Sequence, residues 1–268
     1  MKVLLFGFGS IGQRHSRNLL HIDHDCQLVI VDPYARPPAS VSPVYYTSPD
    51  LAAQHHADAD FAVIASPDQC HLQQMAMLAE LRIPFYVEKP ICTSAQLPGL
   101  DDIIRTVDAR GLRCAVGFQY RFHKNIWEVI DAAPQKYLRF YARDSLLERY
   151  GPNVMGAMMA HPIATALWVL GEAVGVDIVT DGVRAKGCIT HAGGAESFYD
   201  CDMDAGCGRI SQVKFKSGGV DLPPDDGMYV RCMLAYIDWL AGSNRNDKTA
   251  TLEDGRAVVE VMSKCQST

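Results

Sequence analysis

A glycine pattern near the start of the chain constrains the fold more than any other feature. Gly7-Phe8-Gly9-Ser10-Ile11-Gly12 follows an apolar run at residues 2–6 and precedes a helical pattern at residues 10–20. Between a strand and a helix, the first glycine permits a tight turn and the second lets the backbone approach a pyrophosphate. The third lets the helix pack closely on the strand. The free amides of the helix start favour phosphate. We therefore predict a dinucleotide site at Gly7, Gly9, Ser10, Ile11 and Gly12.

An acidic residue lies at the expected distance from this turn. Asp32 ends a predicted strand at residues 27–31 and follows Gly12 by 20 residues. A carboxylate at this place binds the ribose hydroxyls of the cofactor and repels a 2′-phosphate, which favours NAD. Arg36 keeps NADP open as the alternative, because an arginine pairs with that phosphate if Asp32 turns away.

Strands and helices alternate through the first half of the chain. Further predicted strands cover residues 61–65, 85–87 and 113–116, and further helices begin at Ser48-Pro49 or cover residues 68–81 and 97–109. Such alternation indicates a doubly wound parallel sheet, so residues 1–120 are predicted to form a Rossmann domain within an α/β fold.

The pattern changes after residue 120. We predict helices at 125–132 and 154–170, strands at 137–142, 175–181, 197–205 and 209–215, and closing helices at 228–241 and 252–264. Residues 121–268 are therefore predicted to form an α+β substrate domain with a shortened sheet. In one possible arrangement, the closing helices pack back on the first domain.

Composition excludes several classes of protein. The 268 residues carry a net charge of −6, which does not suit binding to a nucleic-acid backbone. The longest apolar stretch, residues 154–170, contains Gly156, His161 and Pro162, and it does not read as a membrane span. Nine cysteines include no C-x-x-C pair, and no signal peptide is recognisable. We therefore expect free thiols in a cytoplasmic protein without a metal site.

A lysine is predicted to carry the chemistry. Val87-Glu88-Lys89-Pro90 ends the fourth parallel strand, and such sheets bind their ligands beyond the carboxyl ends of the strands. Lys89 is thereby expected beside the nicotinamide, where an ammonium group can protonate a carbonyl or hydroxyl oxygen. The competing interpretation is a solvated surface lysine.

Four segments together resemble a known family. They are Ala65-Ser66-Pro67 with His71, Glu88-Lys89-Pro90, the stretch Val-Gly-Phe-Gln-Tyr-Arg-Phe at residues 116–122, and residues 156–172 around His161. With the glycine pattern, this order resembles the Gfo/Idh/MocA oxidoreductases over essentially the whole chain. The resemblance implies a Rossmann domain followed by a domain with an open, mainly antiparallel sheet. It also implies NAD(P)-dependent hydride transfer to or from a sugar-like or other polar small molecule.

The resemblance also implies roles for individual residues. Lys89 matches the family's catalytic lysine and His161 its general acid/base histidine. Cofactor contacts are implied for Ser66, Pro67, His71, Glu88 and Lys89, and substrate contact for Arg121. In relatives the second sheet often forms a subunit interface, so a homo-oligomer is an open possibility.

His161 departs from the family pattern. Relatives usually carry an aspartate three or four residues before this histidine, whereas the chain has Met158 and Ala157 there, and no carboxylate occurs at residues 155–170. Without an anionic partner the ring is expected to be neutral, or simply packed in the helix. Thr165 lies one turn further and can hydrogen-bond the imidazole.

Other segments leave alternatives open. The polar loop ending at Asn153 is a candidate for substrate binding, together with Thr165 and Arg121. Asp200, Asp202 and Asp204 resemble a calcium loop, but their alternation with apolar residues favours a strand with one carboxylate face. Besides sugar oxidation or reduction, reduction of a cyclic imine and a non-catalytic dinucleotide sensor remain alternative functions.

Overall fold

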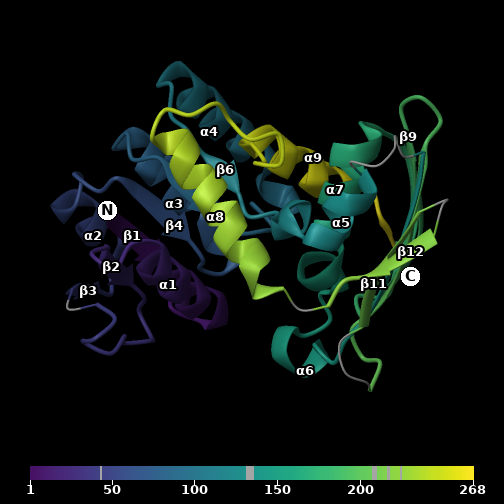
Figure 1. Cartoon of the computed structure of the whole chain (residues 1–268), viewed down its shortest axis with the longest axis horizontal. Coiled ribbons are helices and arrows are strands. Elements are labelled where there is room, and N and C mark those ends of the chain that lie inside the picture. Colours follow the sequence, from purple (N-terminus) through teal and green to yellow (C-terminus); the bar gives the residue numbers. More distant parts are fainter. Residues whose placement is uncertain (43, 131–135, 207–209, 216–217, 224) are drawn as a thin grey trace. The chain divides into compact units, whose positions relative to one another are not determined.

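The computed structural model describes residues 1–42, 44–130, 136–206, 210–215, 218–223 and 225–268. It divides into two compact units (Figure 1). The first comprises Met1–Gly117 and Tyr229–Arg256, and the second comprises Phe118–Met228 and Ala257–Thr268. Three sequence predictions concern positions outside the described residues, namely the helix end at 131–132, Cys207 and the strand start at Arg209.

The first unit is built on a six-stranded parallel sheet. The strand order is β3-β2-β1-β4-β5-β6, and every neighbouring pair is parallel. This is the order of a Rossmann sheet and confirms the predicted α/β fold. The strands are β1 (Lys2–Phe6), β2 (Gln27–Val31), β3 (Val44–Tyr46), β4 (Phe61–Ile64), β5 (Phe85–Val87) and β6 (Ala115–Val116).

Helices cover this sheet and shield its apolar strands. Val3, Leu4, Leu5 and Phe6 of β1 are wholly buried, and each such side chain contributes about 1.5–3 kcal/mol to folding. Ser48 caps α2 and Pro49 opens it, as predicted. The helices are α1 (Ser10–Ile22), α2 (Pro49–His55), α3 (Asp68–Glu80), η1 (Ser94–Gln96), α4 (Leu97–Ala109), α8 (Asp226–Leu240) and α9 (Leu252–Ser263). The second half of α9 belongs to the other unit.

Helix α8 completes the core of the first unit, although it lies far along the sequence. The Tyr236 ring is wholly buried and meets Phe61 edge-on, with ring centroids 5.5 Å apart. It also packs on Tyr86 at 5.7 Å, and its hydroxyl donates to the carbonyl of Arg113 at 3.0 Å. Burial raises the pKa of Tyr236 well above its ordinary value, so the phenol stays neutral.

The second unit contains a seven-stranded mixed sheet of order β12-β11-β7-β10-β9-β8-β13. Four neighbouring pairs are antiparallel and two are parallel, so the predicted open and mainly antiparallel sheet is confirmed. The strands are β7 (Tyr137–Arg143), β8 (Ala173–Thr180), β9 (Arg184–His191), β10 (Glu196–Asp202), β11 (Ile210–Phe215), β12 (Gly218–Asp221) and β13 (Gln266–Ser267). Its helices are η2 (Gln119–Phe122), α5 (Lys124–Ile130), α6 (Leu147–Tyr150), η3 (Met155–Met159) and α7 (Ala160–Leu170).

The helix that carries His161 is not regular. Its first part, η3, has the wide turns of a π-helix, and α7 follows directly with Pro162 in its first turn. Proline lacks an N–H and its ring collides with the carbonyl four residues earlier in a continuous α-helix. The wide turn relieves this collision. The predicted single helix at 154–170 is therefore a π-helical turn followed by an α-helix.

Several strands differ from the sequence predictions. β3, β9, β12 and β13 were not predicted, because they are short or carry charged residues in place of an apolar run. Within the described residues, no helix is both long and apolar enough to cross a membrane.

Candidate functional site

The glycine turn after β1 has the shape that a dinucleotide requires. Gly7 has a φ of 90°, and a Cβ there would meet the carbonyl oxygen of Ala65 at 2.6 Å. A Cβ on Gly12 would overlap the carbonyl of Gly7, which explains the close approach of α1 to the strand. A Cβ on Gly9, in contrast, would have no protein atom within 4 Å. Gly9 therefore borders open space, as a pyrophosphate-binding glycine should.

The start of α1 is suited to bind an anion. Gly9 is the N-cap residue and, having no side chain, supplies no capping group, while Ser10 and Ile11 form the first turn. The amides of that turn, together with the positive end of the helix dipole, are therefore available to a phosphate.

Asp32 is held firmly at the end of β2. One carboxylate oxygen accepts the amide of Phe8 at 2.7 Å, which ties Asp32 to the glycine turn. The other oxygen accepts the amides of Tyr34 and Ala35, at 2.8 and 2.7 Å. Three backbone donors fix this carboxylate, whereas Arg36 is exposed. The oxygen that accepts only the Phe8 amide keeps a lone pair that could accept a ribose hydroxyl.

The segment after β4 is fastened by a buried histidine. His71 lies in the first turn of α3, with its Nε2 2.8 Å from the carbonyl oxygen of Ser66 and its Nδ1 2.9 Å from that of Pro90. Burial lowers the pKa of His71 below its ordinary value, although the two carbonyls oppose this shift. The Ser66 hydroxyl donates to Oε1 of Gln74 at 2.6 Å, and Pro67 is the exposed N-cap of α3.

Glu88 and Lys89 directly follow β5, at the carboxyl edge of the sheet. The Glu88 amide donates to the carbonyl of Ile64 at 2.8 Å, which continues the ladder between β5 and β4 by one residue. The Glu88 side chain is buried, whereas Lys89 is half-buried, and the Lys89-Pro90 peptide is cis.

His15 is a site residue that the sequence analysis did not single out. Its Nε2 lies 2.7 Å from Oε1 of Glu88, although the two residues are 73 positions apart. The sequence contains only a weak signal for this contact. His15 shares the buried face of α1 with Gly12, Ser16 and Leu19, and a histidine on such a face needs a polar partner.

In the second unit, His161 packs against aromatic rings. It is 9% exposed and stacks on Tyr120, with ring centroids 4.7 Å apart and an interplanar angle of 10°. Phe118 meets the same ring edge-on at 6.4 Å. Tyr120 was not predicted as a site residue, because its contact with His161 joins segments that are 41 positions apart in the sequence. A tyrosine face thus covers one side of the His161 ring.

The predicted substrate-binding residues contact the helical segment around His161. The Thr165 hydroxyl donates to the backbone carbonyl of His161 at 2.9 Å, so this bond does not involve the imidazole ring. Asn153 Oδ1 accepts the amide of Gly156 at 3.0 Å. Arg121 is only 2% exposed and donates to the carbonyl of Ala164 at 3.3 Å. Their contact with a substrate stays a prediction.

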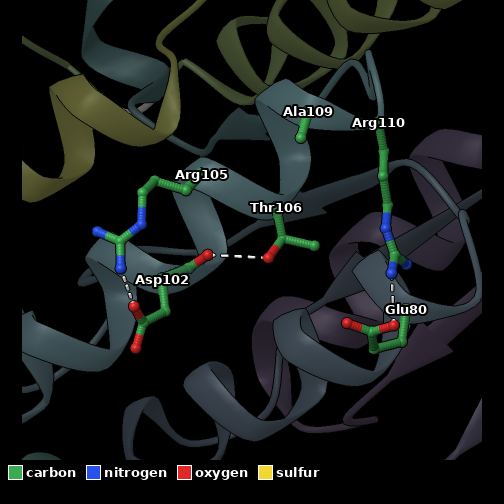
Figure 2. Close-up of a pocket in the computed structure, with 6 residues that line it drawn as sticks. All are labelled: Glu80, Asp102, Arg105, Thr106, Ala109 and Arg110. Carbon is green, nitrogen blue, oxygen red and sulfur yellow. Dashed lines mark hydrogen bonds and ion pairs between the residues drawn. The ribbon is translucent and has the colours of Figure 1, made fainter.

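A depression on the first unit lies apart from these residues. It has a volume of about 420 Å³ and lies between α3 and α4 (Figure 2). Glu80, Asp102, Arg105 and Arg110 line it, and these charged groups pair with one another. None of the predicted cofactor-binding residues belongs to it.

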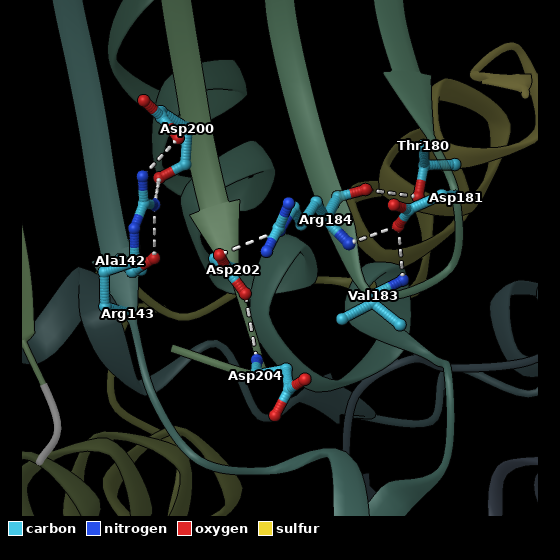
Figure 3. Close-up of polar contacts among 9 residues, drawn as sticks. All are labelled: Ala142, Arg143, Thr180, Asp181, Val183, Arg184, Asp200, Asp202 and Asp204. Carbon is cyan, nitrogen blue, oxygen red and sulfur yellow. Dashed lines mark hydrogen bonds and ion pairs between the residues drawn. The ribbon is translucent and has the colours of Figure 1, made fainter. Parts of the chain in front are cut away.

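The aspartates of β10 form ion pairs and backbone bonds (Figure 3). Asp200 pairs with Arg143 at 2.7 Å, and Asp202 pairs with Arg184 at 3.0 Å and accepts the amide of Asp204. Residues of β10 alternate between buried and partly exposed positions, which confirms the predicted strand. Across the part of the chain that the structure describes, no three metal-ligating side chains form a group that could hold an ion.

Known proteins share this fold. A UDP-N-acetylglucosamine 3-dehydrogenase from Acidithiobacillus ferrooxidans, GnnA, has a TM-score of 0.84 at 18% identity, covering 99% of this chain and 96% of its own. The WlbA dehydrogenase from Thermus thermophilus, solved with NAD and UDP-GlcNAcA, has a TM-score of 0.82 at 18% identity, covering 97% and 93%. A myo-inositol dehydrogenase from Corynebacterium glutamicum has a TM-score of 0.79 at 17% identity, covering 98% and 94%.

The sequence itself matches a family model. No curated protein matches the chain, but the model described as an oxidoreductase family with an NAD-binding Rossmann fold, GFO_IDH_MocA, matches residues 1–118. The glycine turn, the start of α1 and Asp32 all lie in this range and fit the dinucleotide that the model names. Residues 1–118 of the chain therefore match the model of this family of oxidoreductases with an NAD-binding Rossmann fold.

Proposed function

We propose that this protein interconverts a hydroxyl group and a carbonyl group on a sugar-like small molecule, with Lys89 as the proton donor and acceptor. A bound NAD would supply or accept the hydride. In the reducing direction the hydride forms a C–H bond at the carbonyl carbon, and the Lys89 ammonium protonates the oxygen. The hydride, which brings two electrons, and this proton together convert the carbonyl to an alcohol.

The position of Lys89 is the observation that carries this proposal. It follows β5 at the carboxyl edge of a parallel sheet, where such folds bind their ligands. Its neighbours Glu88 and Pro90 both contact buried side chains, so the backbone at Lys89 is well fixed. A fixed backbone favours a defined reaction geometry.

We further propose that His161 assists Lys89 as a hydrogen-bonding group. Its stacking on Tyr120 and its low exposure hold the imidazole in one orientation, which suits a hydrogen-bonding role. Arg121, Asn153 and Thr165 hold the helical segment around His161 through their backbone contacts, and the proposal retains them as substrate-binding candidates.

Asp32 supports NAD as the preferred cofactor. Three backbone amides hold its carboxylate, so turning it away for a 2′-phosphate would break three hydrogen bonds. The exposed Arg36 offers no comparable set of contacts.

The substrate class can be tested with a defined panel. The similar dehydrogenases act on UDP-N-acetylglucosamine or on inositols, which share a six-membered ring with adjacent hydroxyl groups. We expect NAD reduction, followed by the absorbance of NADH, with at least one of UDP-N-acetylglucosamine, UDP-N-acetylglucosaminuronic acid, myo-inositol and scyllo-inositol. NADH oxidation with a cyclic imine alone would favour imine reduction. Tight NADH binding without turnover on either panel would favour a sensor.

The Lys89→Ala and Lys89→Arg variants test the mechanism. We expect both to lower kcat by about 10²- to 10⁴-fold, because neither side chain can donate a proton at neutral pH. NADH affinity, measured by fluorescence, should change less than about threefold, since the glycine turn and Asp32 remain intact. Lys186→Ala, on the exposed side of β9, is the matched control. Turnover near the wild-type rate in both Lys89 variants would refute the proposed role.

A further inference from the structure

Two buried histidines contact the residues on either side of Lys89. His15 comes from α1 and His71 from α3, and each is no more than 1% exposed. His15 contacts Glu88, the residue before Lys89, and His71 contacts Pro90, the residue after it. Burying an imidazole is costly unless its polar atoms find partners, so these contacts stabilise one particular arrangement.

The contact before Lys89 is a side-chain pair. His15 Nε2 lies 2.7 Å from Oε1 of Glu88, and both side chains are almost completely buried. The His15 ring is itself fixed edge-on against Tyr86, at 5.6 Å, and against Tyr229, at 6.5 Å. The Glu88 carboxylate is therefore held against α1 by a ring that has little freedom to move.

The contact after Lys89 joins two loops through one ring. His71 lies between the carbonyl oxygen of Pro90, which follows β5, and that of Ser66, which follows β4. A neutral imidazole donates to one of these carbonyls and an imidazolium to both. In either state, His71 connects the segment after Lys89 to the loop beside the glycine turn.

The sheet cannot hold this segment by itself. The last ladder bonds are those of the Glu88 amide to Ile64 and of the Gly117 amide to Val87, at 2.8 Å each. Pro90 has no N–H with which to continue the ladder. The two histidines lie at the point where backbone pairing ends.

From this placement we infer that His15 and His71 are positioning residues, which hold the backbone on both sides of Lys89 so that its ammonium group occupies a defined place. The inference rests on the proposed role of Lys89 in proton transfer. Both ring nitrogens of His71 lie against backbone carbonyls, so the positioning role requires no direct contact of either histidine with the cofactor that the family resemblance implies for His71. A displacement of a reacting group by about 1 Å is enough to slow a reaction about 100-fold, so loss of either contact should be visible in kcat.

The variants His15→Phe and His71→Phe remove the polar contacts and keep a ring. His15→Gln and His71→Gln retain a donor, and His24→Gln, at an exposed histidine, is the control. We expect the Phe variants to lower kcat by about 10- to 100-fold with KM and NADH affinity within about threefold. The Gln variants should recover most of kcat. A merely structural role would not separate kcat from KM in this way.

A second readout does not depend on a substrate. Lysines are reductively methylated with ¹³C-formaldehyde, and the Lys89 resonance is assigned by its absence from Lys89→Arg. We expect one sharp Lys89 signal in the wild-type protein, both alone and with NADH, and a broadened or shifted signal in the Phe variants. His24→Gln should leave it unchanged. Folded Phe variants with an unaltered Lys89 signal and an unaltered kcat would overturn the inference.

The two readouts separate this inference from the proposed function. If Lys89→Arg keeps full turnover, the proton-transfer role of Lys89 fails, yet the resonance still shows whether the histidines position it. If His15→Phe does not fold, the double variant His15→Phe with Glu88→Leu replaces the pair without leaving a buried charge. An unchanged Lys89 signal in that folded double variant would equally overturn the role of His15.

Discussion

At the scale of single residues, Asp32 serves the protein in two ways. Its carboxylate accepts the Phe8 amide and so closes the glycine turn, and it also accepts the Tyr34 and Ala35 amides at the end of β2. We propose that the same negative charge also faces the adenosine ribose of NAD. On this proposal, one side chain both ties down the glycine turn and favours NAD over NADP.

Replacement of Asp32 should change cofactor preference. In Asp32→Ala we expect NADH affinity to fall about tenfold, which corresponds to one lost hydrogen bond of about 1.4 kcal/mol. NADPH affinity should rise relative to NADH, since the repulsion of the 2′-phosphate is gone. Fluorescence titration of both nucleotides measures the ratio. Arg36→Ala is the control, and an unchanged NADH/NADPH ratio in Asp32→Ala would contradict the role of the carboxylate.

Single residues also show where sequence-based prediction stops. The turn geometry of the glycines and the place of Asp32 after β2 could be predicted, because both follow from positions along one strand–turn–helix unit. His15 and Tyr120 could not, because the former meets Glu88 and the latter meets His161 only after folding. The aromatic surroundings of His161 are likewise a property of the tertiary structure.

At the scale of elements, predictions succeeded where the pattern is local. All strands of the first sheet except β3 were predicted, since each is an apolar run buried on both faces. β9 was missed because its exposed positions carry Arg184, Lys186 and Thr190 and because Gly187 interrupts it. A Cβ at Gly187 would overlap the carbonyl of Asp177 on β8. The close approach of the two strands therefore requires glycine at this position.

Helix α7 is fastened to the sheet at its carboxyl end. His191 Nδ1 lies 2.7 Å from the carbonyl oxygen of Gly171, which follows α7, and Nε2 lies 2.8 Å from the Ser197 hydroxyl. Ser197 in turn contacts the Tyr199 hydroxyl at 2.8 Å. This buried chain connects β9 and β10 to the helix that carries His161.

The buried His191 makes the free energy of unfolding depend on pH. Burial lowers the pKa of His191 below its ordinary 6.5, so the unfolded chain binds a proton near pH 6.5 that the folded state does not. The free energy of unfolding should therefore be greatest above pH 6.5 and fall as the pH decreases to 5.5. Each unit of pKa difference contributes about 1.4 kcal/mol. Urea unfolding at pH 7.5 and 5.5 measures this loss.

Two variants isolate the contribution of His191. His191→Gln keeps hydrogen-bonding groups but does not titrate, so the difference in stability between the two pH values should shrink. His24→Gln, at an exposed position, should retain the wild-type difference. An identical pH dependence in wild type and His191→Gln would show that the proton is bound elsewhere, with His71 the next group to test because burial lowers its pKa as well.

At the scale of the whole molecule, the first unit is discontinuous in sequence. Its sheet is formed by residues 1–117, but most of α8 comes from residues after 228, on the far side of the main segment of the second unit. Tyr236 of α8 packs on Phe61 and Tyr86. Loss of one such buried aromatic side chain costs about 3–5 kcal/mol, which is comparable to the stability of many domains. The Rossmann sheet therefore depends on a segment far outside its own strands.

A fragment of residues 1–117 should consequently be unstable. We expect it to lack near-ultraviolet circular dichroism and to be digested rapidly by a protease, because Phe61 and Tyr86 lose their cover. Joining residues 229–256 to residue 117 through a flexible linker should restore both signals. A fragment of residues 1–117 that unfolds cooperatively by itself would show that α8 is dispensable.

This discontinuity has a consequence for synthesis on the ribosome. The six strands of the first sheet emerge early, yet the helix that completes their core emerges only after residue 228. Until then the nascent chain exposes the aromatic surface that Tyr236 will cover, while the second unit is still being translated. Chaperone engagement during translation should therefore peak before α8 leaves the exit tunnel and decline once it has docked.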